Sequence, residues 1–120
     1  MGINPADKKD IAWNASSKRF MQGWYDKILR PMERDGIDFW WLDWQQWDND
    51  KEFPRLGNVW WINYTTFTDM ERHHDTRPML YHRWGGLGNH RYQIGFSGDA
   101  IISWKSLDFQ PYYTSTASNV

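Results

Sequence analysis

IDFWWLDW, residues 37–44, is apolar on both of its faces and rich in residues that favour β-structure. Helices cover both faces of a parallel sheet, so both rows of side chains on a buried parallel strand are apolar. A run this short also suits a strand better than a helix, which usually needs about 10–12 residues. Residues 37–44 are therefore predicted to form a buried strand of a parallel sheet.

The segment before this strand has the pattern of a helix. Ser16 or Ser17 is expected to cap its start, and Gly36 is a good stop signal. Apolar residues recur at helical spacing, and a proline is expected to kink the helix or end its regular part. The apolar residues are Phe20, Trp24, Ile28 and Met32, and the proline is Pro31.

Downstream, strand-like and helical patterns continue to alternate. The predicted strands are residues 78–84 and 94–98, the predicted helices are residues 59–76 and 103–117, and the loops between them are residues 45–57 and 85–92. Short strands separated by longer helices indicate βαβ units, which build a parallel sheet.

Three strands cannot close a barrel, and a complete (β/α)8 barrel takes about 250 residues. The expected fold class is therefore α/β, as a partial (β/α)8 TIM barrel of about three strand–helix units with parallel strands. Residues 1–120 are expected to be a fragment of a larger barrel, truncated at both ends. Open strand edges and exposed apolar surface predict that this fragment alone is poorly folded and inactive.

The composition excludes several classes of function. Lys and Arg number 14 and Asp and Glu 15, a balance that argues against nucleic-acid partners and against a basic membrane-surface helix. No apolar run approaches the length of a membrane span. The absence of cysteine excludes a disulfide scaffold and a thiol nucleophile. The 10 Trp residues are too many for a small core, so some rings are expected to face a ligand or a neighbouring part of the fold.

Each predicted strand ends in a charged residue: Asp43, Arg83 and Asp99. Parallel strands in a barrel end at the same mouth, so these three residues are expected to converge there. Alternation along a strand places Asp43 on the face of Trp41 and Arg83 on the face of Tyr81. Two carboxylates, an arginine and aromatic rings suit a sugar site, where carboxylates supply the acid and the nucleophile of glycoside hydrolysis.

A plainer interpretation stays open for the same residues. An Asp at a strand end is often only a helix cap or an ion-pair partner, as Asp43 is for Arg83 in that interpretation. His73-His74-Asp75 has histidine but not the ligand spacing of known metal sites, so a solvated helix end is expected there and no metal. Residues 85–88 (GGLG) lack the Gly-Lys-Ser/Thr of a phosphate loop and are expected to turn the backbone at the barrel rim.

Three segments carry a resemblance to a known family: GIDFWWLDWQQW, HRWGGLGNHRYQIGFSGD and WKSLDFQPYYTSTASNV. They resemble the catalytic barrel of glycoside hydrolase family 31, whose members are retaining α-glycosidases, including α-glucosidases and α-xylosidases. In the family, an Arg precedes the acid/base Asp by the same sixteen positions as here, with Gly-x-x-Arg-Tyr in between. The matching residues are Arg83, Gly88, Arg91, Tyr92, Gly98 and Asp99, and the strand motif Trp41-Leu42-Asp43 is similar to the family's Trp-x-Asp nucleophile motif.

The resemblance implies a role for each matching residue. Asp43 is expected to be the nucleophile, and Asp99 the general acid and then the base. Arg83 is expected to bind sugar hydroxyls or the carboxylate of Asp43, whose ionised form its charge favours. Trp41 is expected to line the subsite beside Asp43, and Phe96 to present a ring to the sugar. No metal or organic cofactor is implied.

The sequence also departs from the family. Many members carry Met-Asn-Glu after the nucleophile, whereas this sequence carries Trp44, Gln45 and Gln46, which indicates a different branch and leaves the aglycone preference open. The family's upstream Asp, which grips the terminal sugar, and its His downstream of the acid/base have no counterparts in residues 1–120.

The expected function is therefore retaining hydrolysis of α-glucosides or α-xylosides by double displacement. The alternatives are a non-catalytic carbohydrate-binding protein with an aromatic sugar platform, and an inactive fragment. The expected partners are a carbohydrate substrate and the remainder of the parent barrel, with no nucleic acid and no membrane. The sequence leaves open the sugar, the linkage, the oligomeric state and the compartment.

Overall fold

The computed structural model describes residues 6, 11–43, 49–50, 52–83 and 86–119. Within them, three strands form a parallel sheet in the order β1-β2-β3: β1 (Trp40–Leu42), β2 (Leu80–Arg83) and β3 (Ile94–Phe96). The other elements are α1 (Lys18–Trp24), η2 (Tyr25–Leu29), α2 (Arg30–Arg34), α3 (Asn58–His73), η4 (Asn89–Arg91) and α4 (Trp104–Ala117). This order confirms the prediction of an α/β fold that forms part of a (β/α)8 barrel.

The strands are shorter than the apolar runs that predict them. The sequence predicts strand throughout residues 37–44, 78–84 and 94–98, but only three or four residues of the described part of each run pair with a neighbour. A residue pairs only where the neighbouring strand has a residue opposite it, and the register between the strands limits the hydrogen-bonded pairs to these positions. The loop of residues 85–92 contains the short 3-10 helix η4.

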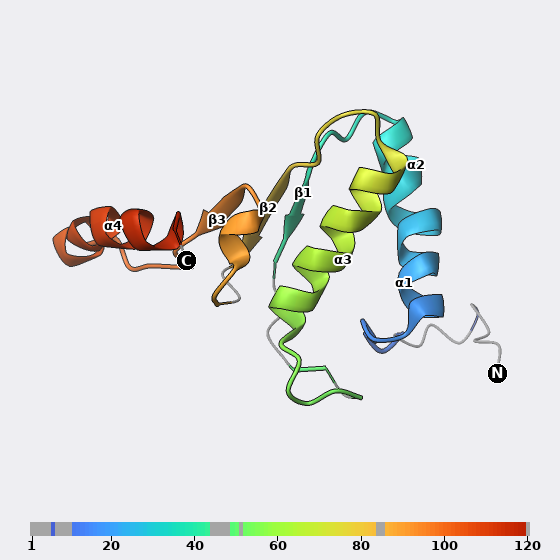
Figure 1. The fold of residues 1–120 in the computed structure, drawn as a ribbon, viewed down its shortest axis with the longest axis horizontal. Helices are drawn as coiled ribbons and strands as arrows, with labels where there is room; N and C mark the ends of the chain where they lie inside the picture. Colours follow the sequence, from blue (N-terminus) through green and yellow to red (C-terminus); the bar gives the residue numbers. More distant parts are fainter. Residues whose placement is uncertain (1–5, 7–10, 44–48, 51, 84–85, 120) are drawn as a thin grey trace.

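Helix α3 lies between the sheet and the continuous run of α1, η2 and α2, while α4 lies at the opposite end of the molecule, beyond β3 (Figure 1). The radius of gyration is 16.5 Å, against roughly 14 Å for a compact domain of this length. The arrangement is therefore an open portion of a barrel rather than a closed globule. Among the described helices, none combines the length and the apolar character needed to cross a membrane.

The two faces of the sheet differ in their surroundings. On the face packed against α3, Leu80 and His82 of the central strand are fully buried. On the other face, Trp41 is 50% exposed and Ile94 39% exposed. In a barrel this second face points inward, so the exposed apolar row is what a partial barrel leaves uncovered.

The first helix begins as predicted, since the Ser17 hydroxyl accepts a hydrogen bond from the amide of Phe20. The predicted interruption also occurs: a π turn, η2, ends two residues before Pro31, which lacks an amide hydrogen and crowds the preceding turn. The apolar row of Phe20, Trp24, Ile28 and Met32 is only in part the buried face of the helix. Met21, Tyr25 and Leu29 are buried, whereas Ile28 and Met32 are 40% and 47% exposed, and Phe20 and Trp24 pack at the margin of the core.

The physical reason lies in a contact with α3. The buried row of Met21, Tyr25 and Leu29 has the same spacing as the row of Phe20, Trp24 and Ile28 and lies one position further along, so spacing alone does not show which row faces α3. The Tyr25 hydroxyl pairs with Thr66 Oγ1 of α3 at 3.3 Å, which turns the row of Tyr25 toward the core. Burial raises the pKa of Tyr25 and keeps it a neutral hydrogen-bonding group.

Charged residues join α2 to the end of α3. Arg30 Nη2 donates to both carboxylate oxygens of Asp69, at 2.7 and 2.9 Å. His74 Nε2 lies 3.1 Å from Glu33 Oε2, and the His74 side chain is only 19% exposed. The solvated helix end expected at residues 73–75 is therefore wrong for His74, because α2 packs alongside the end of α3.

Replacing Leu80 by Ala is expected to lower the free energy of unfolding by about 2–5 kcal/mol, because it leaves a cavity beneath α3. The neighbouring change Met79→Ala is the matched control. Met79 is 36% exposed, so its truncation is expected to cost less than about 1 kcal/mol. Denaturant titration of the protein as its gene encodes it measures both values, and equal losses would contradict the assignment of Leu80 to the core.

Candidate active site

Three charged residues lie at the carboxyl edge of the sheet. Asp43 directly follows β1, Arg83 is the last residue of β2, and Asp99 lies three residues after β3. Because the strands are parallel, all three end at the same edge. Residues that are far apart in the sequence are thus placed in one region.

A single guanidinium contacts both carboxylates. Arg83 Nε donates to Asp43 Oδ1, and Arg83 Nη2 lies 3.4 and 3.5 Å from the two carboxylate oxygens of Asp99. The side chains of Arg83 and Asp43 are 18% and 25% exposed, whereas that of Asp99 is 69% exposed. Asp43 is therefore held closely in a sheltered position, and Asp99 is held loosely at the open side.

The two carboxylates favour the charged form of the arginine still further. The hydrogen bond that Arg83 donates to Asp43, followed by the negative charges of Asp43 and Asp99, raises the pKa of Arg83 against the opposing effect of burial. Because arginine is always charged in proteins, Arg83 is a cation between two acids. The ion pair between Asp43 and Arg83, which is the plainer interpretation of the sequence, does form. The same arginine also contacts Asp99, so both carboxylates lie beside one cation.

Three aromatic rings cover the inner face of the sheet below the charges. Trp41 stacks on Tyr81 with ring centroids 5.0 Å apart, and Phe96 lies 5.9 Å from Trp41 and 5.1 Å from Tyr81. The Arg83 guanidinium carbon lies 5.0 Å above the Phe96 ring, which adds a cation–π contact. Trp41 and Phe96 were expected at the site. The sequence places Tyr81 on the same face as Arg83 but does not assign it to the site. Tyr81 pairs with Trp41 in the strand register, and this pairing is the signal that would have assigned it there.

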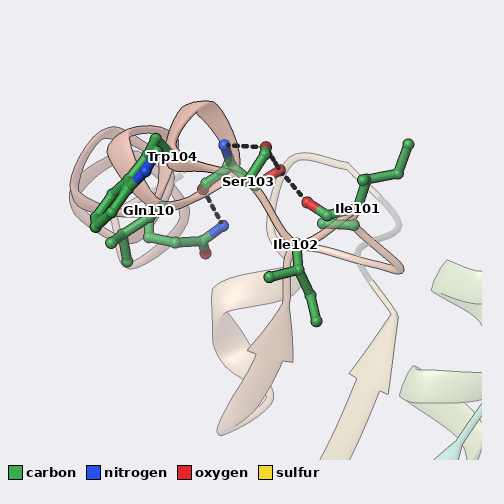
Figure 2. Close-up of a pocket in the computed structure, with 8 residues that line it drawn as sticks. Ile101, Ile102, Ser103, Trp104 and Gln110 are labelled. Atoms are coloured by element: carbon green, nitrogen blue, oxygen red, sulfur yellow. Dashed lines mark hydrogen bonds between the residues drawn. The ribbon is translucent and has the colours of Figure 1, made fainter.

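The chain around Asp99 is shaped by a glycine and by the start of α4. Gly98 has a φ of 91°, a left-handed conformation that turns the backbone sharply just before the acid. Beyond Asp99, the Ser103 hydroxyl accepts from the Ser106 amide at 3.2 Å, and the Ser106 hydroxyl donates to the Ile101 carbonyl at 2.6 Å (Figure 2). These bonds tie the segment after Asp99 to the first turn of α4.

The positions that depart from the family's usual pattern, Trp44, Gln45 and Gln46, lie outside the described residues. The site that can be described therefore consists of Asp43, Arg83 and Asp99 with the three rings. A pair of carboxylates supplies a nucleophile and a proton donor, and aromatic faces accept the apolar side of a sugar ring. This arrangement suits chemistry on a carbohydrate.

A family model described as "Glycosyl hydrolases family 31 TIM-barrel domain" matches residues 6–119. No curated protein matches the chain. Since the family model covers almost every residue and the fold is the corresponding part of a barrel, the chain belongs to glycoside hydrolase family 31.

Proposed function

We propose that the protein is a retaining α-glycoside hydrolase that acts on α-glucosides or α-xylosides. The observation that carries this proposal is the contact of one guanidinium, that of Arg83, with both Asp43 and Asp99. Membership of the glycoside hydrolase family supports hydrolysis as the reaction. The sugar and the α-configuration rest on the resemblance of the motifs around Asp43 and Asp99.

In the first half of the reaction, a carboxylate oxygen of Asp43 attacks the anomeric carbon. The bond to the leaving oxygen breaks as that oxygen takes the proton of the Asp99 carboxyl, which gives a covalent glycosyl-enzyme and a free alcohol. The close contact with Arg83 suits Asp43 to this part, because the guanidinium holds the carboxylate in place.

In the second half, Asp99 removes a proton from water while the water oxygen attacks the anomeric carbon. The bond to Asp43 breaks, its carboxylate is restored, and two inversions leave the configuration of the sugar unchanged. Asp99 is exposed and only loosely held by Arg83, which suits a group that must meet both the leaving group and water.

The rings of Trp41, Tyr81 and Phe96 form the wall against which the sugar packs. The rest of the pocket must come from further strand–helix units. The described sheet ends at β1 on one side and at β3 on the other, and Trp41 faces open space on its inner side. We propose that residues 1–120 are about three units of a catalytic barrel, and that the remainder of that barrel covers this face.

Replacing Asp43 by Asn is expected to lower kcat by at least roughly 10³-fold while sugar binding is retained, because the amide does not attack the anomeric carbon. The test is turnover of aryl α-glucosides and α-xylosides by the protein as its gene encodes it, with sugar binding measured by calorimetry. Trp41→Ala serves as the comparison and is expected to weaken binding by about 10-fold. Normal function in Asp43→Asn combined with lost binding in Trp41→Ala would favour the carbohydrate-binding protein instead.

Replacing Asp99 by Ala is expected to abolish turnover of substrates whose leaving oxygen needs a proton. An α-glycosyl fluoride should still form the glycosyl-enzyme, because fluoride leaves without being protonated. Pre-steady-state release of fluoride measures this step, and mass spectrometry detects the trapped covalent intermediate. Equal losses on the fluoride and on an alkyl glycoside would argue against Asp99 as the acid.

Residues 1–120 produced alone are expected to lack glycosidase activity and a cooperative thermal transition, because Trp41 and the other inner-face side chains stay exposed. Circular dichroism melting and an assay on aryl α-glycosides measure both properties. A sharp transition together with measurable turnover would show that these three units form a complete enzyme.

A further inference from the structure

A buried polar cluster lies directly behind the active-site arginine, on the side of the helices. Its members are Asn63 of α3, His82 of β2 and Asn89 of η4, and each is 0% exposed. All three point a nitrogen at the main-chain carbonyl of Arg83. Asn63 Nδ2 lies 3.4 Å from that oxygen, Asn89 Nδ2 3.2 Å and His82 Nδ1 3.0 Å.

The two asparagines are donors in every state of the histidine. His82 spans two carbonyls, since its Nε2 lies 3.2 Å from the carbonyl oxygen of Tyr92. A neutral imidazole carries one N–H and serves only one of them. When that N–H is on Nε2, the bare Nδ1 faces Asn89 Nδ2 at 3.3 Å and accepts from it. The amides of Asn63 and Asn89 therefore donate to the Arg83 carbonyl in either tautomer of His82.

The hydrogen bonds from Asn63 and Asn89 to Arg83 come at a cost in the free energy of folding. The side-chain oxygens of Asn63 and Asn89 are buried and have no hydrogen-bond partner among the described residues. A buried acceptor without a donor costs about 1–3 kcal/mol, so an apolar side chain would serve packing better at either position. Stability alone thus does not explain why asparagine occupies both positions. The main-chain carbonyl of Arg83, to which both amides donate, does explain it.

Arg83 also needs this support because of its position. It is the last residue of β2, so the strand pairing described for the sheet fixes the main chain up to Arg83 and ends there. Asn89 reaches back to it from η4, which follows Gly88 in a left-handed conformation with a φ of 87°. That turn brings the chain after Arg83 back against the Arg83 carbonyl.

We propose that Asn89 and Asn63 are positioning residues for catalysis, which fix the main chain of Arg83 so that its guanidinium meets Asp43 and Asp99 together. The inference rests on the proposed function. Neither asparagine touches the substrate in this proposal, and each acts through Arg83. Displacement of a catalytic group by a fraction of an ångström to 1 Å is enough to cost up to about 100-fold in rate.

The test is the kinetics of Asn89→Ala and Asn63→Ala in the protein as its gene encodes it, with an aryl α-glycoside as substrate. Each is expected to lower kcat by about 10- to 100-fold with a smaller change in KM. Asn58→Ala is the matched control, because Asn58 is also a buried asparagine of α3 with an unpaired side-chain oxygen, and among the described residues no hydrogen bond joins it to Arg83. It is expected to keep kcat within about twofold, and the melting temperature of each variant reports its folding.

A double-mutant cycle separates positioning from general damage. In an Arg83→Gln background, Asn89→Ala and Asn63→Ala are expected to cause no further loss of kcat, because the group that they position is gone. If Asn89→Ala does not fold, the Asn63→Ala arm carries the same comparison. The proposal is overturned if both variants keep normal kcat, or if they lose as much in the Arg83→Gln background as in the wild type. Normal activity in Asp43→Asn or Asp99→Ala would instead overturn the proposed function itself.

Discussion

The guanidinium of Arg83 is the point on which the site depends, because it alone among the described side chains contacts both acids. Asp43 and Asp99 come from different strand–helix units, and like charges that approach each other repel. A cation between them offsets this repulsion, holds Asp43 closely and keeps the exposed Asp99 loosely beside β2, the central strand. The geometry of the pair is therefore set from the middle of the sheet rather than from either edge.

The sheet in turn depends on the helices behind it. Its strands are only three or four residues long, so few hydrogen bonds hold each pair together. Leu80 and His82 anchor the central strand under α3, and the core beside it is built from Met21, Tyr25 and Leu29 with large aromatic residues at its margin. Packing on the outer face thus fixes the strands, and the inner face is left free to carry chemistry.

The order of elements and the convergence of Asp43, Arg83 and Asp99 were predictable from sequence. Each of these residues ends an apolar run, and parallel topology alone then brings the three to one edge. Tyr81 and Asn89 were assigned no role, since what they do depends on neighbours: the strand register for Tyr81 and a main-chain carbonyl for Asn89. The apolar row of the first helix coincides with its buried face only in part, because four-residue spacing does not show which of two neighbouring rows contacts α3.

That π turn has a consequence for the length of the chain. If one residue were deleted from Tyr25–Leu29, the segment from Lys18 to Arg34 would fit a single continuous α-helix. The π turn holds one residue more than the α-helical turn that would replace it, because its hydrogen bond spans five residues instead of four. The residues after the deletion would therefore keep nearly their present direction, and Arg30 would still face Asp69. The wide turn thus adds one residue to the helix while one side of the helix meets α3 twice, first through apolar contacts and then through charge.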